Sequence, residues 1–230
     1  MFPAGLEILF EDKYLLAINK PHGMVTERDA HLQRTLESLA LRYVQSKEKY
    51  PQKCFIGLPH RLDRPVSGVV LFAKKKSVLK MLAELFSKRE ISKTYLALVE
   101  HRPPEKEGEL VHWLVKDVAN RKAVVRAQES AGSVKAILQY RFITENESGA
   151  LLQIQLITGK YHQIRAQLSH IGCPVIGDAY YGASKVYKEN SIALHAGKLQ
   201  LIHPATHEPL EIKAPLPDDE LWNFFKYAID

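Results

Sequence analysis

The chain has 230 residues, 46% of them hydrophobic, so it can bury a core in one large domain or two small ones. Thirty-two basic and 26 acidic residues give a formal net charge of +6, which favours a polyanionic partner such as nucleic acid, although a basic protein without one has the same balance. The two cysteines, Cys54 and Cys173, exclude a disulfide framework and indicate a reducing cytoplasm. No run approaches the ~18 apolar residues of a membrane helix, and the first residues lack a signal-peptide pattern, so we expect no membrane partner.

The first part of the chain predicts a hairpin and a helix. Residues 7–10 and 14–18 are typical of two strands around a short polar turn. The second strand ends in Lys20-Pro21-His22-Gly23, where proline and glycine stop strand pairing and leave Lys20 for a phosphate contact or for solvent. Residues 35–45 carry apolar side chains at helical spacing behind a Thr35 cap and predict an amphipathic helix.

A charged turn precedes the next apolar strand. Residues 60–68 read His-Arg-Leu-Asp-Arg-Pro-Val-Ser-Gly, and an apolar run at 69–73 follows. Pro65 restricts one backbone position and Gly68 frees another, so the turn can present the Asp63 carboxylate at a sheet edge. Asp63 is therefore a candidate catalytic group, and a local ion pair with the flanking arginines is the structural alternative.

The middle of the chain changes from helix to strand. Residues 77–86 predict a helix, and lysines at 74, 75, 76 and 80 crowd its first turns, as suits a phosphate backbone or a solvated basic face. Residues 93–99 predict a strand, and a polar loop at 103–108 separates it from a β-rich second half. The strands expected there cover 110–115, 123–127, 134–142 and 151–156.

The residues from 158 onward predict a short helix, ended by Gly172, that places Arg165 next to a buried stripe. A guanidinium there needs a carboxylate partner, and an ordinary salt bridge is the structural interpretation. A turn-rich loop at 177–182, a strand pair at 192–196 and 199–203, and a final helix at 218–228 follow. His203 and His207 suggest zinc, but Pro204 breaks the helix that would align them, so we expect no metal.

Five short motifs resemble the RluA-type pseudouridine synthases, in order and over nearly the whole chain. Val66 stands where that family more often has threonine, and Lys160 where it more often has arginine, which weakens any planar bidentate contact at that position. The motifs are Lys20-Pro21-x-Gly23, His60-Arg61-Leu62-Asp63-x-x-x-Ser67-Gly68, Lys93-x-Tyr95, Thr158-Gly159-Lys160-x-His162-Gln163-Ile164-Arg165, and Gly177-Asp178-x-x-Tyr181-Gly182.

The resemblance implies an α+β fold, with a mixed, largely antiparallel sheet flanked by helices and an active-site cleft across the sheet. It implies a single catalytic domain over residues 1–230 with no separate RNA-binding domain before it. The implied activity is that of an RNA pseudouridine synthase, which flips one uridine out of structured tRNA or rRNA and isomerises it. We expect a cytoplasmic monomer that binds RNA but not DNA and needs neither metal nor organic cofactor.

The resemblance also implies roles for individual residues. Asp63 matches the catalytic aspartate, Arg165 the arginine that pairs with it, and Tyr95 the tyrosine that stacks on the target base and is proposed to move a proton. A buried strand tyrosine is the alternative for Tyr95. Arg61 matches a residue that holds the flipped nucleotide. Lys20, His60 and Ile164 complete the substrate-binding candidates.

Three further hypotheses concern the partner and the reaction class. Lys20, Lys74, Lys75, Lys76 and Lys160 are candidates for a phosphate-facing surface. A glycoside hydrolase would need a second carboxyl group at a defined separation, and no second acid recurs in the motifs. A non-catalytic RNA-binding module would explain the charge, but it gives no reason for an ordered set of aspartate, tyrosine and arginine.

Overall fold

The computed structural model describes residues 6–27 and 34–228, which fold into two compact units. Unit 1 runs to Ile91 and also takes in Ala196–Pro215, whereas unit 2 comprises Ser92–His195 and the segment from Leu216 onward. Within the described ranges, no helix has the length and apolar character needed to cross a membrane. That residues 1–230 act as a single catalytic domain stays a prediction.

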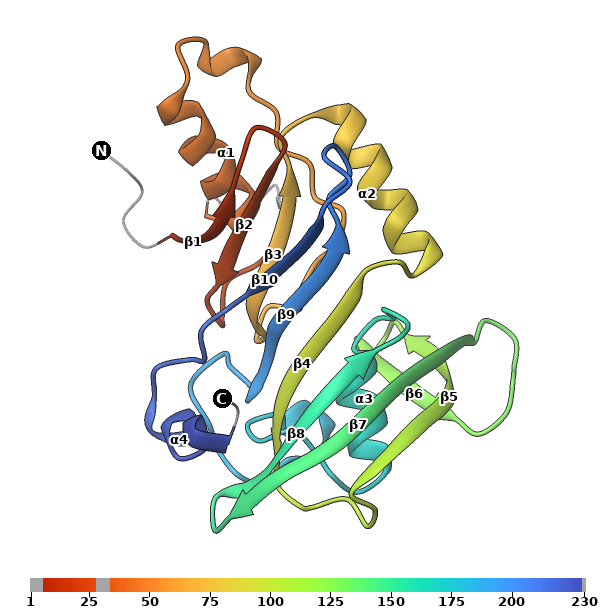
Figure 1. The fold of residues 1–230 in the computed structure, drawn as a ribbon. Helices are drawn as coiled ribbons and strands as arrows, with labels where there is room; N and C mark the ends of the chain where they lie inside the picture. The colour runs from red at the N-terminus through yellow and green to blue at the C-terminus, as the bar shows by residue number, and fades with distance from the viewer. Residues whose placement is uncertain (1–5, 28–33, 229–230) are drawn as a thin grey trace. The chain divides into compact units, whose positions relative to one another are not determined.

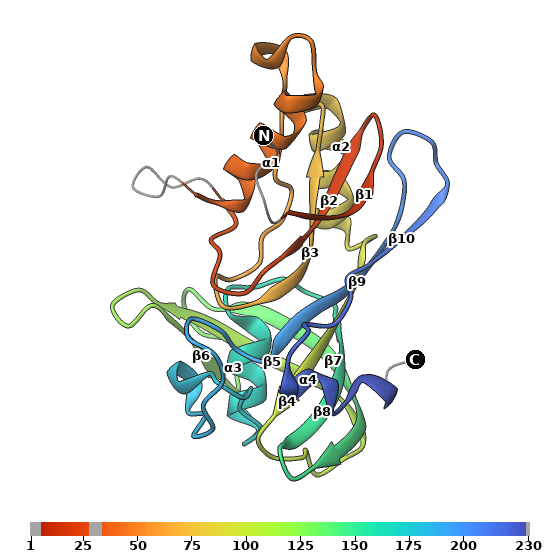
Figure 2. The ribbon, with the colours of Figure 1, turned by 90° about the vertical axis from the view of Figure 1, so that its left-hand side faces the viewer.

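Unit 1 contains a twisted, mixed and mostly antiparallel set of strands with a helix on either side (Figures 1 and 2). Its strands lie in the order β1-β2-β3-β9, with β10 paired to β9. The β1–β2 hairpin and the helix predicted from residue 35 are confirmed. The elements are β1 (Glu7–Glu11), β2 (Leu15–Lys20), α1 (Leu36–Lys47), the 3-10 turn η1 (Pro51–Lys53), β3 (Ser67–Ala73), α2 (Lys76–Lys88), β9 (Leu194–Ile202) and β10 (Pro209–Lys213).

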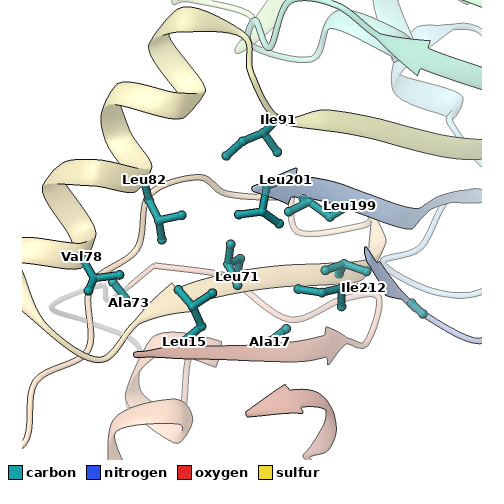
Figure 3. Packing of buried hydrophobic residues seen from close by; sticks show 12 residues of the cluster. Leu15, Ala17, Leu71, Ala73, Val78, Leu82, Ile91, Leu199, Leu201 and Ile212 are labelled. Carbon is teal, nitrogen blue, oxygen red and sulfur yellow. The ribbon is translucent and has the colours of Figure 1, made fainter. Parts of the chain in front are cut away.

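The core of unit 1 forms because both faces of its central strands are apolar. Alternate residues of β2 and β3, such as Leu15 and Leu71, pack against Val78 and Leu82 of α2 (Figure 3). The residues between them, including Leu16, point to the opposite face and are also fully buried. An unbroken apolar run is therefore a strand covered on both faces.

The expected cap fixes the start of α1. The Thr35 hydroxyl accepts a hydrogen bond from the Ser38 N–H at 3.2 Å, and the Ser38 hydroxyl accepts one from the Thr35 N–H at 3.0 Å. This reciprocal pair satisfies amide groups that the first turn of a helix leaves without partners.

The strands of unit 2 are antiparallel to one another, and the unit carries a short helix. Its strands lie in the order β4-β8-β7-β5-β6, and the predicted strands and the helix ended by Gly172 are confirmed. Together the two units give the α+β class and the largely antiparallel sheet expected. The elements are β4 (Ser92–Val99), β5 (Glu107–Asp117), β6 (Lys122–Arg126), β7 (Val134–Asn146), β8 (Gly149–Leu156), α3 (Gln163–His170), η2 (Ala179–Tyr181), α4 (Glu220–Asn223) and η3 (Lys226–Ala228).

The last third of the chain contains three differences from the predicted elements. The strand pair at 192–196 and 199–203 is wrong, because β9 continues through Gly197, whose carbonyl accepts a hydrogen bond from the Ala214 N–H. Strand β10, which completes that ladder, was not predicted because it begins at a proline. The helix expected at 218–228 is shorter: α4 has four residues, and a tight turn then buries Phe225 beside Trp222.

Candidate active site

A buried lysine lies beneath the charged turn in unit 1. Lys20 ends β2, is 0% exposed, and donates hydrogen bonds from Nζ to the carbonyl oxygens of Met24 at 2.7 Å, Pro21 at 3.0 Å and Arg64 at 3.1 Å. Three acceptors match the three N–H bonds of an ammonium group. Lys20 therefore ties the loop after β2 to the turn that carries Asp63.

Burial lowers the pKa of Lys20 to about 7, while the nearby Asp63 carboxylate acts in the opposite direction and raises it. The hypothesis that Lys20 belongs to a phosphate-facing surface is wrong, because the side chain is enclosed and its donors point at the backbone. Its position next to Asp63 connects it to the site in a different way, through electrostatics and loop geometry.

Further hydrogen bonds hold the same two loops together. The Thr26 hydroxyl donates to the Leu62 carbonyl at 2.7 Å, and the Gly23 N–H donates to the Arg64 carbonyl at 2.9 Å. Within the turn, the Val66 N–H donates to the Asp63 carbonyl at 3.1 Å. The backbone on both sides of Asp63 is thus fixed, while its side chain lies at a half-buried position.

Gly68 sets how closely the motif approaches β9. Its φ is +114°, and a Cβ built at this position would lie 2.3 Å from the Ala196 carbonyl oxygen. Only glycine allows this conformation and this approach, so the end of the motif is dictated by backbone packing within unit 1.

His60 and Arg61 lie in different surroundings. The Leu71 N–H donates to Nε2 of His60 at 3.0 Å, and the imidazole stacks on Phe86 at a centroid distance of 4.9 Å, so this ring supports β3. Arg61 is exposed, and its guanidinium donates to Glu27 at 2.7 Å. A surface pair of this kind exchanges readily with other anions because water screens it.

In unit 2, a buried ion pair holds Arg165. Its Nε and Nη2 donate to the two oxygens of Asp178 at 2.6 and 2.9 Å, and the residues are 6% and 2% exposed. The fork-to-fork geometry fixes the plane of the guanidinium. The expected carboxylate partner is therefore present, and within unit 2 it is Asp178. The pairing of Arg165 with Asp63 stays a prediction.

Tyr181 completes the surroundings of Arg165. Its ring lies 4.9 Å from the guanidinium carbon, and its hydroxyl accepts a hydrogen bond from the Ala123 N–H at 2.8 Å and lies 2.9 Å from Nδ1 of His162. Burial raises the pKa of Tyr181 to about 12, against smaller lowering effects of the Ala123 amide and Arg165, so the phenol stays protonated. In the sequence, Asp178 and Tyr181 stand out only as parts of the motif at 177–182. The buried position expected for Arg165 could have predicted Asp178, because a buried guanidinium requires a carboxylate partner.

The other two candidates in unit 2 are buried. Tyr95 lies in β4 opposite Ile154 of β8 and is 9% exposed, and Ile164 lies in the first turn of α3 among buried residues. Lys160, in contrast, is exposed just before α3.

A family profile described as RNA pseudouridylate synthase matches residues 14–170. The chain belongs to this family. The motifs of both units fall in or next to the matched range, and the RluA-type membership inferred from them is confirmed by the names of the relatives below.

Curated relatives of the synthase cover most of its length. It is 35% identical over 93% of its chain to an uncharacterized RNA pseudouridine synthase, YhcT, of Bacillus subtilis, and covers 70% of that protein. It is 32% identical to ribosomal large subunit pseudouridine synthase D of Zymomonas mobilis, with 93% of this chain and 70% of the relative covered. It is also 32% identical to tRNA pseudouridine synthase C of Vibrio cholerae, with 94% of this chain and 93% of the relative covered.

A solved structure extends the likeness to the fold. The human RNA pseudouridylate synthase domain containing 4 superposes with a TM-score of 0.76 at 28% identity, over 92% of this chain and 88% of that one. The synthase therefore has the pseudouridine-synthase fold expected, and it is an RNA-modifying isomerase that acts on uridine in RNA.

Metal binding finds no support among the residues that the structure describes, which contain no cluster of three or more histidine, cysteine or acidic side chains suited to an ion. In the synthase, Nε2 of His203 instead lies 3.0 Å from Oδ2 of Asp12. Its Nδ1 accepts hydrogen bonds from the Ala205 and Thr206 amides. Its two ring nitrogens are thus committed within unit 1. That the reaction needs no cofactor stays a prediction.

Proposed function

We propose that this synthase converts a specific uridine of structured tRNA or rRNA into pseudouridine, with Asp63 as the group that starts the reaction. The carboxylate acts by attack on the anomeric carbon, by attack on the base, or by assisting glycal formation. In each route the bond from the base to the ribose breaks, the base turns, and a carbon-5 bond replaces it, so no atom is gained or lost except the exchanged carbon-5 proton. The enzyme acts as a cytoplasmic monomer on RNA, without DNA, membrane or cofactor.

The observation that carries this proposal is the way the Asp63 turn is anchored. The buried Lys20 ammonium joins the turn to the preceding loop, and its pKa responds to the Asp63 charge. A carboxylate can act as a nucleophile or as a base at a sugar carbon. A fixed backbone with a partly exposed side chain is what positioning for catalysis requires.

Base flipping follows from the chemistry. A stacked uridine offers neither its glycosidic bond nor a freely turning base, and extrusion costs a few kcal/mol. We assign Tyr95 as the stacking partner that returns ~1–3 kcal/mol, and Arg61 as the exposed group that holds the flipped nucleotide. Arg165, held rigid by Asp178, orients the Asp63 carboxylate. Lys20, His60 and Ile164 complete the proposed substrate-binding residues.

The names of two relatives support a proposal for the substrate class. The two whose names state a target act on large-subunit ribosomal RNA and on tRNA. We place the substrate of this synthase in the same class, as a compact stem-loop whose shape is read by the protein surface.

The test is Asp63→Asn, which keeps size and hydrogen bonding but removes the charge. Turnover, measured as tritium release from RNA labelled at carbon-5 of uridine, should fall by more than roughly a thousandfold, while unfolding and RNA affinity stay close to wild type. Asp218→Asn is the matched control, because Asp218 lies outside both parts of the site, and it should keep full activity. A folded, RNA-binding Asp63→Asn protein with a tenth of wild-type turnover would refute the assignment.

A further inference from the structure

Three segments that are distant in sequence meet at the end of unit 1 where β3 stops (Figure 1). The Lys74 N–H donates to the Tyr14 carbonyl at 2.7 Å, and the Lys47 ammonium donates to Glu11 at 2.7 Å. A bridge between Gly57 and Ala73 joins the chain after η1 to the last residue of β3. The turn after β1, the end of α1 with η1, and the start of α2 therefore form one continuous surface.

This surface, which we call the lysine end, carries most of the net charge of the protein. Segments 11–15, 47–54 and 74–80 contain eight lysines and three acidic residues, a net charge of +5 out of +6 for the whole chain. Glu11 is already paired with two of those lysines, so the others remain in excess. The lysines are Lys13, Lys47, Lys49, Lys53, Lys74, Lys75, Lys76 and Lys80.

Aromatic rings lie among these lysines. Tyr50 is 52% exposed, and the ammonium groups of Lys49 and Lys53 lie 5.6 and 5.1 Å from its ring centroid. The ring of Tyr14 lies 4.6 Å from the ammonium of Lys75. An exposed aromatic face bordered by cations can stack on an unpaired base while the cations contact its phosphates.

The lysine end is separate from the Asp63 turn. Asp63 precedes β3 and Lys74 follows it, and the seven residues of this strand span about 23 Å at ~3.3 Å per residue. Charge at this distance does not serve the reacting nucleotide, because it is more than two Debye lengths away at physiological salt.

We propose that the lysine end is a second RNA-contact surface, which holds the phosphate backbone of the substrate RNA about 23 Å from the target uridine, with Tyr50 stacked on an unpaired base. This inference rests on RNA being the substrate. It means that the enzyme selects RNAs long enough to reach both surfaces, and it adds Lys49, Lys53 and Tyr50 to the lysines at the start of α2.

The test compares two variants with the same loss of charge. In the first, Lys49, Lys53, Lys76 and Lys80, all exposed, are replaced by glutamine. In the control, the exposed Lys88, Lys106, Lys135 and Lys226 are replaced instead. Binding of fluorescently labelled bulk tRNA, isolated from cells that lack this gene, is measured by anisotropy over a series of salt concentrations, and thermal unfolding verifies that both variants fold.

The lysine-end variant should bind roughly tenfold or more weakly, with a log-log salt slope shallower by about three, because each lost phosphate contact removes about 0.7 to 0.9 from the slope. Tyr50→Ala should weaken binding roughly fivefold or more without changing the slope. The control variant should keep the wild-type slope. Equal salt slopes for the two lysine variants, whether at the wild-type value or below it, would overturn the proposal.

Turnover at saturating RNA separates this inference from the role of Asp63. The lysine-end variant should keep the wild-type kcat for tritium release and show a raised KM, because its changes lie far from the reacting atoms. Asp63→Asn should lose turnover and keep the wild-type salt slope. If Asp63→Asn stayed active, the proposed chemistry would fail, but the slope comparison would still decide the fate of the lysine end.

Discussion

Two candidate site residues are buried cations, Lys20 in unit 1 and Arg165 in unit 2, and they are stabilised differently. In unit 1, Lys20 donates to three backbone carbonyls, and burial brings its pKa to about 7. In unit 2, Arg165 meets the carboxylate of Asp178 through two parallel hydrogen bonds. Backbone carbonyls carry partial charges and cannot neutralise an ammonium, whereas a carboxylate neutralises a guanidinium.

This difference indicates that Lys20 and Arg165 have different roles. The lysine joins two loops and adds a positive charge next to Asp63 that responds to pH. The arginine is rigid and stays charged throughout the physiological range, because a guanidinium is not deprotonated in proteins. Three changes test this contrast, the first at the carboxylate, the second at the lysine and the third at an exposed arginine.

Asp178→Asn should have the largest effect on stability. It removes the charge of the carboxylate that Arg165 meets through two parallel hydrogen bonds, and removal of one partner of a buried pair costs about 3 to 5 kcal/mol. Urea unfolding measures this change, and Asp218→Asn provides the matched control, which should stay within about 0.5 kcal/mol of wild type. A loss below about 1 kcal/mol would mean that Asp178 does not stabilise Arg165 as a pair.

Lys20 should give stability a pH dependence of intermediate size. Between about pH 7 and the unfolded-state value near 10.5, the unfolded chain binds a proton that the folded chain has lost, so stability rises with pH. Relative to Lys20→Met, the wild-type protein should gain about 2 kcal/mol between pH 7 and pH 9. Urea unfolding at each pH measures the difference.

Lys20→Met itself supplies the baseline, because methionine fills a similar volume and does not titrate. Asp178→Asn provides the second control, and its stability difference from wild type should not change over this pH range. A flat difference between wild type and Lys20→Met would show that Lys20 keeps its proton in the folded protein across the whole range.

Arg61→Gln should have the smallest effect on stability. The Arg61 and Glu27 side chains are 58% and 53% exposed, and exposed pairs contribute less than about 1 kcal/mol. We expect a change in unfolding free energy below about 0.5 kcal/mol, together with a several-fold rise in KM for RNA if Arg61 holds the flipped nucleotide. An unchanged KM would confine Arg61 to its surface ion pair with Glu27.

The sequence by itself determined the elements whose pattern is local. Period-two alternation identified the strands of unit 2, Thr35 marked the start of α1, and Gly172 marked the end of α3. The ordered motifs around Asp63 and Arg165 identified the family, because they record chemistry that many chains share. These signals are readable because each depends on residues within a few positions of one another.

The tertiary structure decided which partners the buried groups meet. Lys20 reaches a carbonyl 44 positions away, and Arg165 meets an acid 13 positions away across a turn. Likewise, β9 continues through Gly197 because β10 returns beside it, and the predicted final helix stops early because Phe225 turns inward. A sequence pattern shows that a charge lies next to a buried face, but only the folded backbone fixes which donor or acceptor it meets, because that choice depends on distances between segments remote in the chain.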